Sequence, residues 1–140
     1  MKYYKHPETG EVFAYENEQE RQEWGAPELV EMTPEEIDAH LNPPPTAEQI
    51  IAQYEATVQR WLDEQARALG YDDIRSAVTY AEEPAVPKYQ QEGQAMRRLR
   101  SLAWGRCYEI LNEALAGQRS IPTKEELIAE MEALKSRCAL

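Results

Sequence analysis

This chain of 140 residues has 26 acidic side chains, which in so acidic a chain are typical of a solvated surface, but it has only two histidines and two cysteines, and their spacing keeps them apart. His6 stands beside a proline and His40 falls near the end of a short helical pattern. Neither has a second histidine three or four residues away. Because a metal site needs several ligands that converge, the sequence predicts two surface histidines and neither a metal nor a cofactor.

Nucleophilic catalysis has equally little support. No nucleophile-elbow motif surrounds any serine or cysteine, and the six glycines are scattered singly instead of forming a phosphate-binding loop. Cys107 falls inside a helical pattern, which favours a small buried hydrophobic residue, and Cys138 falls near a C-terminus that we expect to be frayed before Leu140. We predict no catalytic residues and do not expect an enzyme.

One cluster of cationic side chains could bind another protein. It is the only dense positive patch in the chain, and it consists of Arg97, Arg98, Arg100 and Arg106. The alternative is a helix face neutralised by the acidic N-terminal half or by Asp72 and Asp73. The residue types alone leave both readings open.

Aromatic side chains form a second candidate group. The candidates in the C-terminal two thirds are Trp61, Tyr71, Tyr80, Tyr89, Trp104 and Tyr108. Amphipathic rings are typical interface anchors, but they also fill the core of a small bundle, so we expect most of the six to be core. Across the whole chain the predicted partner-binding residues are Tyr3, Tyr4, Phe13, Tyr15, Arg97, Arg100 and Trp104.

The N-terminal elements that would position these side chains read as a small β module. Residues 2–5 and 12–15 are rich in aromatic and β-branched residues, and Pro7 and Gly10 between them suit a hairpin turn. Residues 16–24 fit either a short surface helix or a loop, and residues 28–32 fit a third short strand.

Helix starts are the clearest local signals. Thr33, Thr46 and Thr123 each precede a Glu or Gln by three residues, which is the capping-box pattern. The apolar spacing predicts helices over 34–41, 47–69, a short one within 72–81, one from 88 or 93 to 115, and a last one from 123. Successive prolines after Asn42 forbid helix.

These elements predict an α+β fold with two parts. The first is a β-rich module with a short helix over residues 1–42, and a proline linker follows over 43–46. The second is a helical bundle over 47–140.

Charge and hydropathy restrict the classes of partner. The net charge of −11 weighs against nucleic acid and anionic membrane surfaces, since binding phosphates needs clustered Lys and Arg. No apolar run approaches the roughly 18–20 residues that span a bilayer, and no signal peptide is visible. We therefore expect a soluble protein made inside the cell that binds neither nucleic acid nor membrane.

Three stretches together resemble bacteriophage tail-fibre assembly proteins. The first runs from Tyr3 to Tyr15 and the second from Val30 to Thr46. The third comprises residues 69–74, 79–81, 92–95, 104–111 and 116–123. The usual ending of such proteins has Leu-Pro after Glu-Leu-Ile-Ala-Glu, whereas this chain has Met131-Glu132.

The resemblance implies a non-catalytic chaperone that binds the phage tail-fibre polypeptide and assists its folding or trimerisation. It implies a phage- or prophage-encoded protein in the host cytoplasm, with the virion tail as a second location, and it leaves homo-oligomerisation open. Two alternatives stand beside it: a structural protein that remains on the tail fibre or tail, and an acidic inhibitor of a host nucleic-acid enzyme.

Overall fold

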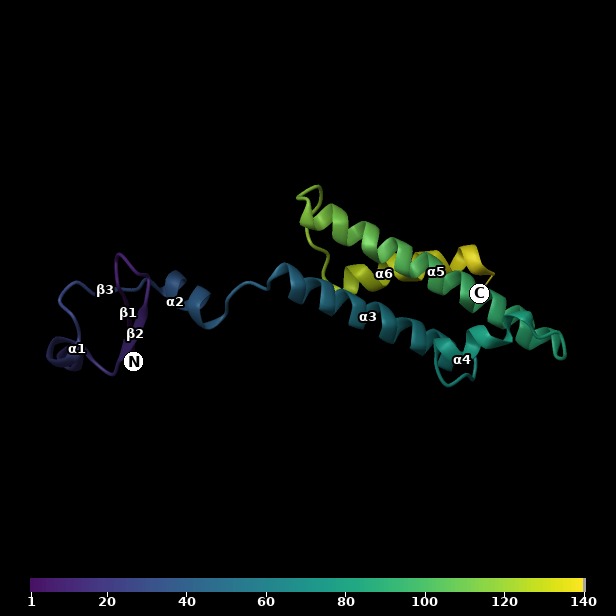
Figure 1. Ribbon diagram of the computed structural model, residues 1–140, viewed down its shortest axis with the longest axis horizontal. Helices are drawn as coiled ribbons and strands as arrows, with labels where there is room; N and C mark the ends of the chain where they lie inside the picture. Colours follow the sequence, from purple (N-terminus) through teal and green to yellow (C-terminus); the bar gives the residue numbers. More distant parts are fainter. Residues whose placement is uncertain (140) are drawn as a thin grey trace. The chain divides into compact units, whose positions relative to one another are not determined.

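The computed structural model describes residues 1–139, and the chain divides into two compact units, Met1–Pro45 and Thr46–Leu140. The first contains a three-stranded antiparallel sheet and the second is helical, which confirms the α+β class (Figure 1). None of the helices within residues 1–139 combines the length and apolarity that crossing a bilayer requires.

The sheet of the first unit has the strand order β2-β1-β3. Its strands are β1 (Lys2–Lys5), β2 (Val12–Tyr15) and β3 (Val30–Glu31). Tyr4 is opposite Phe13 in the hairpin, and Gly10 has a φ of +74° in the connecting turn. Glycine suits this positive φ because it has no Cβ. The predicted hairpin and third strand are thus present.

Two short helices cover opposite faces of this sheet. They are α1 (Glu18–Trp24) and α2 (Pro34–Leu41). The Tyr4 side chain contacts Glu18 and Arg21 of α1, whereas its neighbour Lys5 pairs with Glu36 of α2. Since successive strand residues point to opposite faces, the two helices lie on either side of β1.

The second unit is a bundle in which each of three longer helices packs on the other two (Figure 1). The elements are α3 (Ala47–Ala68), α4 (Ile74–Val78), the 3-10 helix η1 (Thr79–Glu82), α5 (Pro87–Leu115), α6 (Lys124–Leu134) and the 3-10 helix η2 (Lys135–Cys138). Its fully buried side chains include Val58, Leu62, Leu99, Ile110 and Leu127. Burial of these apolar side chains is the main force that holds the helices together.

Local capping explains where the helices begin. Thr33, Thr46 and Thr123 are all N-caps whose hydroxyls accept a backbone N–H three residues later. In the described chain the reciprocal capping-box bond forms only at Thr46, where the Gln49 side chain accepts the Thr46 amide. At Thr33 the corresponding Glu36 side chain pairs with Lys5 instead.

Several expectations for the helical unit need correction. The apolar spacing within 47–69 predicts Ile51 and Leu69 on the core-facing side, but Ile50 is buried and Ile51 only half-buried, while Leu69 is exposed and Ala66 is buried. Cys138 is buried in η2, where we expected fraying, and Leu140 lies outside the described residues. The pattern misplaced Ile51 because a one-residue rotation of a helix changes which side chain meets the core, and it misplaced Leu69 because α3 ends at Ala68.

Candidate partner-binding site

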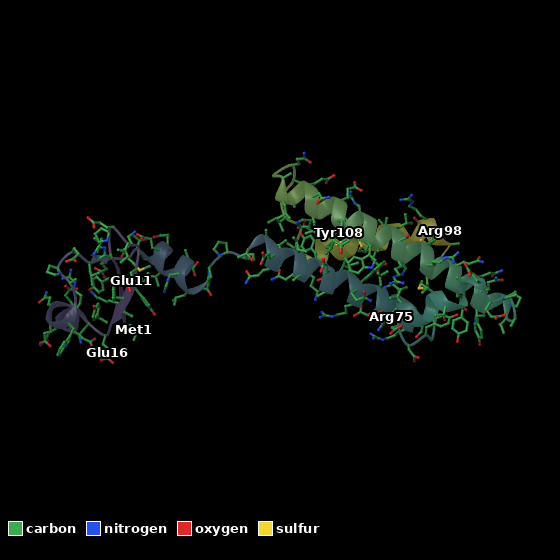
Figure 2. All side chains as sticks on the ribbon, in the orientation of Figure 1. Met1, Glu11, Glu16, Arg75, Arg98 and Tyr108 are labelled. Carbon is green, nitrogen blue, oxygen red and sulfur yellow. The ribbon has the colours of Figure 1, made fainter. Side chains whose placement is uncertain are left out.

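One face of α5 carries a stacked pair of aromatic rings. Trp104 and Tyr108 are one helical turn apart, with ring centroids 5.9 Å apart and planes inclined by 26°. Tyr108 is 46% exposed, and its hydroxyl donates to Glu55 of α3 at 3.2 Å. Trp104 is half-buried against the core. Both rings thus have fixed positions and keep surface available for contact; Figure 2 labels Tyr108 of this pair.

Two of the predicted arginines extend this surface along the same helix. Arg97, Arg100, Ser101 and Trp104 line an open hollow of about 330 Å³. With Tyr108 they form what we term the aromatic–arginine face. Their spacing of three or four residues places them on one side of α5, so the helix presents cationic and aromatic groups together.

The arginines differ in their ion pairs. Arg97 lies 3.2 Å from Glu82 in an exposed pair, whereas Arg98 and Arg100 have no carboxylate within 4.0 Å among residues 1–139. Arg100 does line a second hollow, of about 380 Å³, that also includes Asp63 and Asp73. Among the described residues neither arginine forms an ion pair with Asp72 or Asp73, which the alternative reading named: Arg97 pairs with Glu82, and Asp73 only shares a hollow with Arg100.

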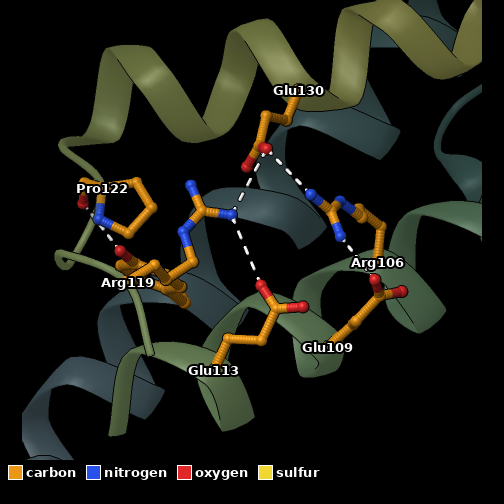
Figure 3. A network of polar contacts seen from close by, with 7 residues as sticks. Arg106, Glu109, Glu113, Arg119, Pro122 and Glu130 are labelled. Carbon is orange, nitrogen blue, oxygen red and sulfur yellow. Dashed lines mark hydrogen bonds and ion pairs between the residues drawn. The ribbon is translucent and has the colours of Figure 1, made fainter. Parts of the chain in front are cut away.

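Arg106 belongs to a different site. Its guanidinium contacts Glu109 at 2.6 Å and Glu130 of α6 at 3.0 Å, and Arg119 also reaches Glu130, at 3.4 Å (Figure 3). Arg119 lies 3.9 Å from Glu113 as well. These half-buried groups tie α5 and the segment before α6 to α6, so the sequence cluster of four arginines divides between a surface and an internal network.

The predicted residues of the N-terminal unit mostly contribute to packing. Tyr4 is buried, donates its hydroxyl to Glu18 and lies under the Arg21 guanidinium, 5.3 Å from the ring centroid. The hydrogen bond to Glu18, followed by burial, raises the pKa of Tyr4 to about 12. Tyr3, Phe13 and Tyr15 are half-buried. As the unit stands, the Tyr4 ring is not available to a partner.

Exposed rings lie elsewhere than expected. Of the six aromatic candidates in the helical unit only Trp61 is buried; Tyr71 and Trp104 are half-buried, and Tyr80, Tyr89 and Tyr108 are exposed. The expectation that most are core was wrong. Trp24, which sequence reasoning did not select, is 78% exposed at the end of α1. The α1 sequence has no apolar stripe. A helix without such a stripe does not pack on a core, so the sequence could have indicated that Trp24 is exposed.

The groups considered for chemistry are separated. The His6 ring accepts from the amides of Glu8 and Thr9, and His40 is exposed beside Tyr3. Cys107 is buried as predicted, and burial raises the pKa of its thiol to about 11. Across residues 1–139 no three His, Cys, Asp or Glu side chains are grouped so that they could hold a metal ion.

Comparisons of this chain with family models, with curated proteins and with solved structures found no match. The chain is therefore described by its own structure: it is an α+β protein of two units, and its helical unit presents the aromatic–arginine face.

Proposed function

We propose that this chain is a phage tail-fibre assembly chaperone that binds the fibre polypeptide and assists its folding and trimerisation without catalysing a reaction. The observation that supports the proposal best is the aromatic–arginine face. Trp, Tyr and Arg are the residues most enriched among those that dominate protein–protein binding energy. Here one helix presents all three within about three turns.

The face is organised before a partner arrives. Tyr108 is held by Glu55, and Trp104 packs on the core on one side and on Tyr108 on the other. Binding therefore has to order few side chains, which reduces its entropic cost. The arginines next to the rings suit a partner segment that carries carboxylates as well as apolar groups.

The N-terminal sheet offers a second mode of binding. β2 is an edge strand, since it pairs with β1 alone in the described chain. A trimeric fibre exposes strand edges and apolar surface while it assembles, and such surfaces aggregate. Strand addition at β2 would cover an edge while the aromatic–arginine face covers apolar surface.

The test is co-expression with the tail-fibre polypeptide of the same phage, followed by pull-down and native mass measurement. We expect a stable complex and a larger yield of trimeric fibre. Arg100→Glu should weaken the complex, whereas Arg60→Glu, an exposed charge reversal on α3, should not. No complex, together with a fibre that folds equally well alone, would refute the proposal. Mass spectrometry of purified virions then tells whether the chain leaves the fibre or remains as a structural subunit.

A further inference from the structure

Three tyrosines meet where the chain passes from α3 through α4 and η1 into α5. Tyr71 follows α3, Tyr80 lies in η1 and Tyr89 lies in the first turn of α5. Their ring centroids are 5.3 Å apart for Tyr71 and Tyr80, 5.8 Å for Tyr80 and Tyr89, and 6.5 Å for Tyr71 and Tyr89. Each ring therefore contacts the other two, and we term this cluster the tyrosine tip.

The tip is open to a partner. Tyr80 is 38% and Tyr89 43% exposed, and two neighbours in the sequence, Leu69 and Val86, are similarly exposed. Tyr71 is the least exposed of the three rings, and its hydroxyl is buried. Clustered exposed aromatic rings of this kind typically mark interaction surfaces.

The backbone beneath the rings is tightly packed. A Cβ on Gly93 would lie only 2.6 Å from the amide nitrogen of Ala81, so α5 and η1 meet backbone to backbone. The Gln94 side chain also donates to the Ala81 carbonyl at 3.1 Å. The segment that carries Tyr80 is thus held against the helix that carries Tyr89, and the two rings have fixed positions before any contact is made.

The segment of the chain that carries the three rings has a one-sided charge. Residues 71–92 contain five acidic and two basic residues, so 2 − 5 = −3. The rest of the helical unit, residues 46–70 and 93–140, contains ten of each, so its net charge is zero. Glu82 and Glu83 are exposed beside Tyr80, although Glu82 also pairs with Arg97. The whole net charge of this unit therefore belongs to the segment that carries the three rings.

We propose that the tyrosine tip binds an arginine-containing segment of a partner protein. A guanidinium stacks on the exposed face of Tyr80 or Tyr89, and the surrounding carboxylates complement its charge. Arginine fits better than lysine because its planar, weakly hydrated group stacks on rings and forms paired hydrogen bonds with a carboxylate. The inference is separate from the fibre proposal, since it needs only a cationic segment.

The test is a titration of the full chain with a short peptide of alternating glycine and arginine, followed by NMR. We expect saturable shifts of the Tyr80 and Tyr89 ring signals that weaken with added salt. Tyr80→Ser and Tyr89→Ser should each lower the affinity about two- to fivefold. Glu83→Gln removes a carboxylate next to Tyr80 while keeping an oxygen that can accept the Ala85 amide, and it should weaken binding too.

Matched controls lie outside both proposed surfaces. Trp24→Ser removes an exposed ring of the N-terminal unit and Glu64→Gln an exposed carboxylate of α3, and both should leave the affinity unchanged. Equal losses in the controls, or the absence of saturable shifts at Tyr80 and Tyr89, would overturn the proposal. So would a chain dimer in sedimentation that Tyr80→Ser dissociates and the peptide does not, because a second copy would then occupy the tip.

Discussion

Gly93 of α5 and Ala81 of η1 pack backbone against backbone, and a side chain on Gly93 would lie 2.6 Å from the Ala81 nitrogen and 2.9 Å from the Ala77 carbonyl oxygen. A glycine in the interior of a long helix normally costs about 0.5–1 kcal/mol relative to alanine. Here it permits the close approach of α4 and η1, whose segment carries Tyr80.

Gly93→Ala should therefore destabilise the helical unit by about 1–3 kcal/mol despite the better helix propensity of alanine, because the added methyl group meets backbone atoms that cannot move aside. Urea unfolding followed by far-ultraviolet circular dichroism measures the change. Gly105, on the same helix, has no atom within 4 Å of an added Cβ, so Gly105→Ala should stabilise by up to about 1 kcal/mol. Equal effects at the two positions would contradict the packing argument.

The Tyr54 hydroxyl on α3 donates to the Pro122 carbonyl at 2.6 Å, across 68 residues of sequence. Tyr54→Phe leaves that buried carbonyl without its donor and should cost about 1–3 kcal/mol. The same unfolding experiment applies. Tyr108→Phe removes the exposed hydrogen bond to Glu55 and should change the free energy of unfolding by less than about 0.5 kcal/mol. A similar loss of stability in both variants would contradict the argument that the cost of losing the bond depends on burial.

The Tyr4–Glu18 hydrogen bond should make the N-terminal unit sensitive to pH at both extremes. It lowers the pKa of Glu18 below its ordinary value of 4.5, so the stability it contributes is present above that value and is lost as pH falls through the lowered pKa. It also raises the pKa of Tyr4 from 10.0 to about 12, so stability is present below 10.0 and is lost as pH rises toward 12.

Ultraviolet titration of tyrosine ionisation tests this directly. One tyrosine should titrate near 12, and Tyr4→Phe should remove that step. Glu18→Gln should move the step toward lower pH, because the carboxylate that accepts the hydrogen bond is gone. A high-pH step that persists in Tyr4→Phe would assign it to another residue.

Cys107 and Cys138 should be unreactive in the folded chain. Both thiols are buried, and burial raises the pKa of both, that of Cys107 from 9.0 to about 11. Near neutral pH the thiolate fraction of Cys107 should be roughly a hundredfold below that of an ordinary thiol, since only the thiolate reacts. A chromogenic disulfide reagent should modify both residues in guanidinium and neither without it; rapid modification of the native chain would contradict the packing of α5 and η2.

Part of the candidate site could be predicted from the sequence. Arg97, Arg100 and Trp104 were selected because they combine cationic and aromatic character at helical spacing, and they do line one hollow. Tyr108 was not among the predicted partner-binding residues, although it completes the stacked pair. Periodicity gives the face of a helix on which a residue lies, but it does not tell which neighbouring helix covers that face.

The sequence by itself determined where most elements begin and end, because caps, prolines and glycines act on the backbone within a few residues. Thr33, Thr46 and Thr123 begin helices, and Gly70 and Gly117 follow the ends of α3 and α5 with positive φ. These choices need no distant partner.

Only the tertiary structure decided which side chains became surface. Arg106 pairs with Glu130 of α6, whereas Arg100 is exposed. Tyr71, Tyr80 and Tyr89 come from three separate segments and contact one another. The physical reason is that burial and ion pairing depend on residues far away in the chain, whose approach is set by the packing of whole helices.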